Sequence, residues 1–104
     1  MKKLIQEFIT DNQNALTHCR SAFDTIRNSS PIEACELLHI GTDRASGLLS
    51  LSRSAYSKGV IDRTILMEAV ALANAWLAFD DEVLDLVAEI VPVPEAPLIG
   101  IVLH

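Results

Sequence analysis

Cysteine, aromatic residues, glycine and proline are all scarce in this chain of 104 residues. Two cysteines, Cys19 and Cys35, are too few for the disulfide framework of a small secreted domain. The four glycines form no glycine-rich loop that could cradle a phosphate or line a substrate cleft. Because only 5% of the residues are aromatic, the hydrophobic half of the composition is mainly Leu, Ile, Val and Ala. An Ala- and Leu-rich chain of this kind favours helices.

Long hydrophobic runs and an excess of positive charge are also missing. No segment approaches the ~18 consecutive apolar residues of a membrane span, and Glu7 and Asp11 interrupt any apolar core of a signal peptide. The formal net charge is −6, whereas a protein that follows a nucleic-acid backbone needs a positive face. We therefore expect a cytoplasmic protein that inserts into no membrane and binds no nucleic acid.

The spacing of apolar residues predicts three long helices. Between residues 3 and 28 they recur at steps of three and four, and Asn12 fills the one polar position of this seam. The segment Ser30-Pro31-Ile32-Glu33 predicts the start of a second helix, with a serine N-cap and a glutamate that completes a capping box. Asp62 is expected to cap the third helix, in which Trp76 lies on the seam and should anchor the core.

Interruptions of the second and third helices remain open at this point. Gly41 and Gly47 weaken the second helix, and we expect near Gly41 either a kink or a close approach to another helix that needs the missing side chain. A break at Gly41-Thr42-Asp43, with Thr42 or Asp43 capping a second piece, is the alternative. Gly59 is the predicted C-terminal cap of that helix. Asp80 is either a polar seam residue of one continuous third helix, which we favour, or it or Asp81 begins a separate fourth helix.

The predicted fold is all-α, an antiparallel bundle of three long helices over residues 1–91 with an extended tail over residues 92–104. A kink or split in the second or third helix would raise the number of helices to four or five. Three prolines end the third helix and stiffen the start of the tail. The uncharged segment after Pro97 would be prone to aggregation if it were exposed. We therefore expect the tail to pack on the bundle or on a partner, through Leu98, Ile99, Ile101, Val102 and Leu103.

Apolar residues outnumber the positions that one slender bundle can bury. Each predicted helix carries apolar residues beyond its seam, and such wide arcs imply neighbours on more than one side, so we expect a homodimer or another protein partner. Charge is uneven as well, since every charged residue from 80 to 95 is acidic, and an acidic surface complements a basic protein. The candidate partner-binding residues in this stretch are Asp80, Asp81, Glu82, Asp85 and Glu89.

Candidate catalytic or metal-binding groups are weak. Cys35 and His39 are four residues apart, and a helical hairpin would bring His18 and Cys19 close to them. A zinc site or a Cys–His nucleophile is conceivable there, but buried cysteine acting as a small hydrophobic residue is the better interpretation. Metal sites in carboxylate bundles draw ligands from several helices, whereas these acids crowd onto one. We therefore assign no catalytic residue, metal or cofactor.

These observations predict a non-catalytic, small acidic helical protein that acts through protein–protein interaction as an adaptor, regulator or inhibitor. In size and charge alone the chain resembles small acidic inhibitors of bacteria and their phages, anti-CRISPR proteins among them. That resemblance implies an alternative in which an acidic face blocks a nucleic-acid-binding surface of a larger protein. A metal-dependent helical-bundle enzyme is the remaining alternative.

Overall fold

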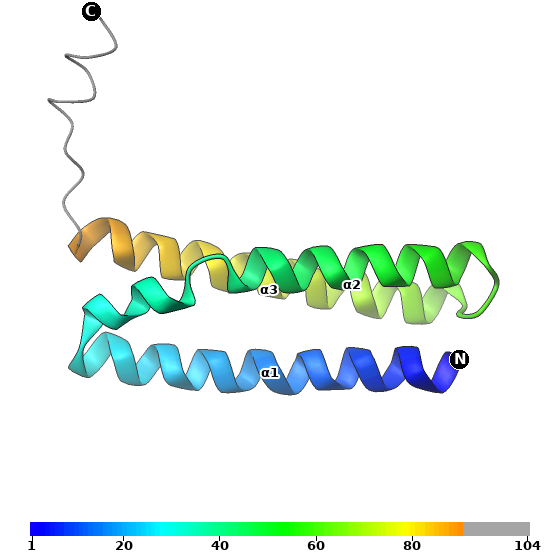
Figure 1. Ribbon diagram of the computed structural model, residues 1–104, viewed down its shortest axis with the longest axis horizontal. Coiled ribbons are helices and arrows are strands. Elements are labelled where there is room, and N and C mark those ends of the chain that lie inside the picture. The colour runs from blue at the N-terminus through cyan, green and yellow to red at the C-terminus, as the bar shows by residue number, and fades with distance from the viewer. Residues whose placement is uncertain (91–104) are drawn as a thin grey trace, which may run out of the picture.

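The computed structural model describes residues 1–90, which form three long helices and one short 3-10 helix. In chain order these are α1 (Lys2–Ser29), η1 (Pro31–Leu37), α2 (Ile40–Ser57) and α3 (Arg63–Ile90). Figure 1 shows α2 and α3 as an antiparallel hairpin with α1 lying along it, and the N-terminus lies at the same end as the turn between α2 and α3. The predicted all-α bundle of three antiparallel helices is confirmed. The predicted tail over residues 92–104 lies outside the described residues.

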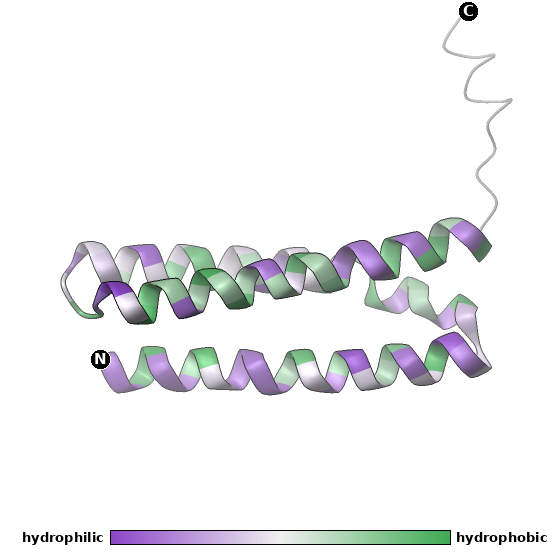
Figure 2. Cartoon of the chain, turned by 180° about the vertical axis from the view of Figure 1, so that it is seen from behind, coloured by the Kyte–Doolittle hydropathy of each residue, from purple (hydrophilic) through white to green (hydrophobic). Residues whose placement is uncertain are grey.

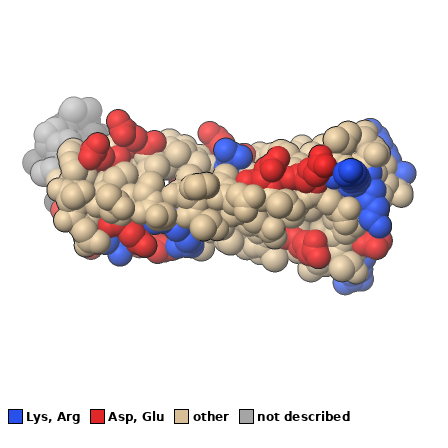
Figure 3. Space-filling view, turned by 90° about the horizontal axis from the view of Figure 1, so that it is seen from below, with Lys and Arg blue, Asp and Glu red and all other residues tan. Residues whose placement is uncertain are grey.

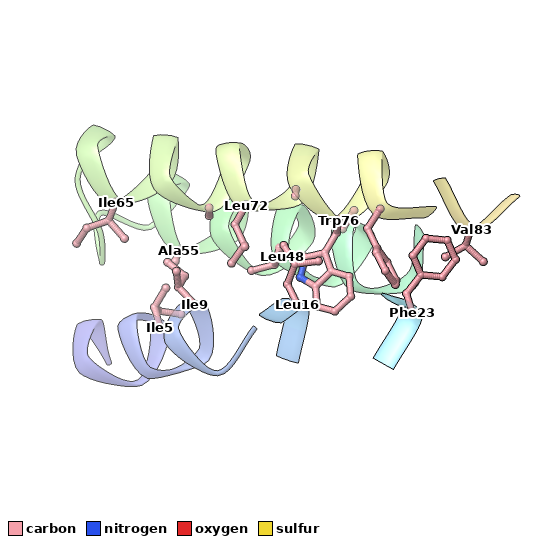
Figure 4. Close-up of a cluster of buried hydrophobic side chains, with 14 of the residues drawn as sticks. Ile5, Ile9, Leu16, Phe23, Leu48, Ala55, Ile65, Leu72, Trp76 and Val83 are labelled. Carbon is pink, nitrogen blue, oxygen red and sulfur yellow. The ribbon is translucent and has the colours of Figure 1, made fainter. Parts of the chain in front are cut away.

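The core runs the length of the bundle and is built mainly from the seams of α1 and α3. Its aliphatic members include Ile5, Ile9 and Leu16 from α1, with Leu48 from α2 and Val83 from α3 (Figure 4). At one end three aromatic rings pack edge to face, with ring centroids 5.7 Å apart for Phe23 and Phe79 and 6.1 Å apart for Trp76 and Phe79. Since Trp76 is completely buried, its predicted role as core anchor is confirmed.

The polar position of the α1 seam is satisfied by hydrogen bonds. Asn12 is buried, its Nδ2 donates to the Phe8 carbonyl oxygen at 2.9 Å, and its Oδ1 accepts from Arg44 at 3.1 Å. The Arg44 guanidinium also lies 5.6 Å from the centre of a Trp76 ring. By contrast, Ser52 Oγ and Trp76 Nε1 are buried without a hydrogen-bond partner among residues 1–90. Asn12 therefore ties α1 to α2, whereas the Ser52 hydroxyl adds no bond to the core.

The second helix begins differently from the sequence prediction. Pro31 starts a 3-10 helix instead of an α-helix. The Ser30 and Glu33 side chains do not form the predicted capping box. The Glu33 N–H donates to the Ser30 backbone carbonyl at 3.0 Å, and the serine hydroxyl makes no cap bond. The interruption falls at His39, whose φ of 70° is left-handed, and α2 starts at Ile40. The second helix is therefore split, as the alternative prediction allowed, and the break falls just before Gly41.

The physical cause of this break lies on α3. Asp80 Oδ1 accepts the backbone N–H of His39 at 3.1 Å, and Asp80 Oδ2 accepts the hydroxyl of Thr42 at 2.8 Å. A carboxylate at the first turn of α2 satisfies an amide that lacks an intrahelical partner and interacts favourably with the helix dipole. Asp80 thus caps α2 from a neighbouring helix, while α3 itself continues through Asp80 as the favoured interpretation predicted.

Gly41 lies at a close approach between α2 and α3. A Cβ atom at this position would lie 2.7 Å from Asp80 Cβ and closer still to the carbonyl oxygen of Trp76. At Gly47 a Cβ atom would meet no other atom within 4 Å. Of the two outcomes expected near Gly41, the close approach is confirmed, and only this glycine is needed for helix packing.

The turn between α2 and α3 follows its sequence signals. Gly59 has a φ of 74°, its N–H donates to the Tyr56 carbonyl at 3.0 Å, and the Val60 N–H donates to the Ala55 carbonyl at 2.8 Å. These two bonds define a Schellman motif and confirm Gly59 as the end of α2. Asp62 Oδ1 accepts the Ile65 N–H at 3.0 Å, which confirms the N-terminal cap of α3.

Candidate partner-binding surface

The five acidic candidates on α3 fall into two groups. Asp80 caps α2 with both carboxylate oxygens, and Glu82 pairs with Arg20 of α1 at 2.9 Å. Asp81, Asp85 and Glu89 are exposed and form no hydrogen bond or ion pair within residues 1–90. Two of the five candidates therefore make contacts to other helices of the bundle, and three are free of such contacts in residues 1–90.

The Glu82–Arg20 pair connects α3 to α1 at the surface. The two side chains are 46% and 42% exposed, so solvent screens the pair and its contribution to stability is at most about 1 kcal/mol. Arg20 also lies over the Phe79 ring, 5.6 Å from the centroid. The ion pair therefore mainly orients the Glu82 side chain and adds little to the stability of the fold.

A cleft of about 350 Å³ opens between the end of α1 and the end of α3. Carboxylates of Glu82, Asp85 and Glu89 line it together with Leu86 and the guanidinium of Arg27. Arg27 stacks over the Phe23 ring, 4.7 Å from its centroid. Figure 3 shows acidic side chains at this end of the molecule, beside the grey residues. Because Arg20 pairs with Glu82, the charges left are those of Asp85 and Glu89 against Arg27, which leave the cleft negative, and we call it the acidic cleft.

The groups weighed for metal or nucleophilic chemistry are not assembled. Among residues 1–90 no three His, Cys, Asp or Glu side chains are placed to hold a metal ion. Cys35 lies on η1 and His39 follows it in a left-handed conformation, so the two do not share an α-helix face as the four-residue spacing suggested. Burial raises the pKa of the Cys19 thiol above its usual 9.0, and the Arg44 charge offsets part of this rise. A thiol with a raised pKa is a poor nucleophile at neutral pH.

A second surface lies on the side of α3 that faces away from the core. Its residues follow one another at alternating steps of three and four, and we call them the outer face of α3: Met67, Val70, Asn74, Leu77, Asp81, Leu84 and Ala88. Met67, Leu77 and Leu84 are among the exposed large hydrophobic residues. Figure 2, in which α3 lies in front of α2, shows hydrophobic segments along the helix.

Sequence reasoning noted that each helix carries apolar residues beyond its seam but missed the outer face as a unit. The spacing of Val70, Leu77 and Leu84 at intervals of seven residues was available as a signal. It was hidden because α3 carries the buried seam as well, and the two overlapping patterns make the helix apolar on most sides. The wide apolar arc predicted for this helix is thus partly core and partly surface.

In the part of the chain that the structure describes, no helix combines the length and the apolar character required to cross a membrane. Comparisons with known proteins found no family model, no curated protein and no solved structure that matches the chain.

Proposed function

We propose that this is a non-catalytic cytoplasmic protein that acts by binding another protein, as an adaptor, regulator or inhibitor, and that the acidic cleft is its contact with a basic partner surface. The supporting observation is that Asp85 and Glu89 line a cleft of about 350 Å³ and have no ion-pair partner among residues 1–90. Solubility alone does not require that carboxylates line a cleft.

The chemistry of the cleft suits a lysine or arginine side chain. Each carboxylate can accept charge-assisted hydrogen bonds, which are stronger than neutral ones. Leu86 supplies an apolar wall for the methylene stem of such a side chain. The net charge of −6 would also accelerate encounter with a basic partner, in a manner that salt suppresses.

Self-association is part of the same proposal. The described bundle already has a continuous core, yet Met67, Leu77 and Leu84 remain on its surface. Burying a row of large aliphatic side chains against a second protein surface is lower in free energy than leaving them exposed to water. We therefore propose a homodimer in addition to the contact made by the acidic cleft.

Charge reversal in the cleft tests the partner contact. The tagged protein and its D85K/E89K variant would each be used to capture proteins from a lysate of the producing cells, over a series of salt concentrations. We expect a partner that is retained by the wild-type chain, weakened by salt and lost with D85K/E89K. Both substituted residues are exposed and make no bond within residues 1–90, so the variant should fold normally.

The matched control is E7K/D11K, which changes the net charge equally on exposed residues of α1 far along the chain from the cleft. We expect this control to retain the partner. Equal capture by all three proteins would refute the role of the acidic cleft, and equal loss in both variants would reduce it to an effect of net charge.

A second candidate is an inhibitor that occupies a nucleic-acid-binding surface. Glu82, Asp85 and Glu89 form a row of carboxylates along one side of α3, and a row of negative charges is the feature that such a surface recognises in a nucleic-acid backbone. If this candidate is correct, an oligonucleotide should displace the protein from the captured partner. Simultaneous binding of both would refute it.

A further inference from the structure

The outer face of α3 repeats like a coiled-coil seam. Val70, Leu77 and Leu84 occupy one heptad position, and Met67, Asn74, Asp81 and Ala88 occupy the other. From Met67 to Ala88 the seam is about 32 Å long at about 1.5 Å per residue. That is three heptads, enough for a second helix to pack along it with side chains in register.

Opposite charges lie at the two ends of this face. Arg63 precedes the seam and Asp81 lies 18 residues later. At about 3.6 residues per turn this is five full turns, so both side chains project on the same line of the helix. Lys58 adds positive charge near the first end, and Asp85 adds negative charge near the other. Figure 3 shows Lys and Arg gathered at the end of the molecule opposite the grey residues.

This arrangement of charge selects both the partner and its direction. A second copy of the chain placed parallel would set Arg63 against Arg63 and Asp81 against Asp81, which is repulsive. A second copy placed antiparallel would set each Arg63 against an Asp81, twice, as the two-fold symmetry of a homodimer requires. The face is therefore complementary in charge to itself only in the antiparallel direction.

We infer that two copies of this chain form a homodimer through the outer face of α3, packed antiparallel with Arg63 of each copy opposite Asp81 of the other. This inference rests on the proposed self-association and specifies its surface and direction. Positions whose numbers sum to 144, as 63 and 81 do, then face each other. Met67 meets Leu77, and Val70 lies beside Asn74, a polar seam residue of the kind that fixes register in coiled coils.

Removing the aliphatic contacts tests the surface. By sedimentation equilibrium the wild-type chain should have twice the monomer mass of 11.4 kDa, whereas M67E/L77E should have the monomer mass and unchanged helical circular dichroism. The matched control is I32E/L51E on η1 and α2. Leu51 is 39% exposed against 38% for Leu77, and Ile32 is 59% exposed against 50% for Met67. The control should remain a dimer.

The inference is overturned if the wild-type chain is monomeric at millimolar concentration, if M67E/L77E remains a dimer, or if the control dissociates equally. These outcomes leave the acidic cleft untouched, because neither variant changes a residue that lines it. Capture of a partner by the cleft and dimerisation by the outer face can therefore fail separately.

A charge exchange tests the register. R63E and D81R should each weaken dimerisation several-fold, and R63E/D81R should restore it. Within one chain the two positions are about 27 Å apart along α3, so restoration can only report a contact between copies. A double variant as weak as either single variant would contradict the pairing.

A distance between spin labels tests the direction. A C19S/C35S/A88C chain carries one label near the end of α3, on an exposed residue. In the antiparallel register the two labels lie about 24 Å from the centre of the pair at position 72, on opposite sides of it, so they should be about 48 Å apart. A parallel pair would bring the labels to about 10 Å, the distance between packed helix axes, and would overturn the inference.

Discussion

Replacing Gly41 by alanine tests the packing of α2 on α3 with the addition of a single methyl group. The new Cβ atom would lie 2.7 Å from Asp80 Cβ and even closer to the Trp76 carbonyl oxygen. The backbone oxygen belongs to the middle of α3 and cannot rotate away as a side chain can. Either α2 must move outward by about 1 Å or the cap that Asp80 provides must distort.

The expected cost follows from two opposing terms. Overpacking of a well-packed helix contact costs about 1–3 kcal/mol, and here the contact is with backbone, which favours the upper part of that range. Alanine recovers up to about 1 kcal/mol of helix propensity relative to glycine. We therefore expect Gly41→Ala to lower the free energy of unfolding by about 1–2 kcal/mol.

Gly47→Ala is the matched control in the same helix. Gly47 is exposed, and a Cβ atom there meets nothing within 4 Å. Only the propensity term applies, so this variant should be more stable by up to about 1 kcal/mol. The same substitution is thus expected to have opposite signs six residues apart.

Both values can be measured by urea unfolding followed by circular dichroism. All samples need the same protein concentration, because the proposed dimerisation would add to the apparent stability. The midpoint should fall for Gly41→Ala and rise for Gly47→Ala, with the denaturant slope unchanged in both. If Gly41→Ala is as stable as Gly47→Ala, α2 does not approach α3 as closely as described, and the reason given for a glycine at position 41 is wrong.

Three further variants or reagents probe single groups. Asp80→Ala removes the cap of α2 and should cost about 1–2 kcal/mol in urea unfolding, whereas Glu68→Ala, an exposed control on α3, should change little; equal effects would contradict the cap. Ser52→Ala removes a buried hydroxyl that has no hydrogen-bond partner among residues 1–90. It should raise the thermal midpoint, because the free energy of unfolding should rise by about 1 kcal/mol, and a loss of stability would indicate a hydrogen bond to Ser52. Iodoacetamide at pH 8 should modify exposed Cys35 before Cys19, whose raised pKa disfavours the thiolate; peptide mass spectrometry that finds equal rates would refute this.

The features predicted correctly from the sequence are those that neighbouring residues determine. Gly59 ends α2 and Asp62 begins α3 because each cap forms with backbone groups within four residues. The seams of α1 and α3 follow the helical period, and even the polar Asn12 falls at its expected position. Local geometry and the period together were sufficient to predict a three-helix bundle.

The errors arise where contacts are distant in the chain. The capping box at Ser30 has the right residues, but α2 is capped instead by Asp80, a carboxylate 41 residues beyond His39. No local pattern contains that information. The acidic surface was predicted from composition, yet the arginines of α1 that share it, Arg20 and Arg27, depend on how α1 aligns with α3. The sequence patterns do not show which residues of α1 lie beside which residues of α3.

The turn between α2 and α3 has a consequence for the order in which the chain folds. It joins by a few residues the two helices that pack most extensively on each other, whereas α1 contacts α2 much less. Closing a short loop costs little entropy, so this hairpin should form early and persist longest. We expect α1 to detach first under mild denaturation, and its amide hydrogens to exchange with solvent before those of the hairpin.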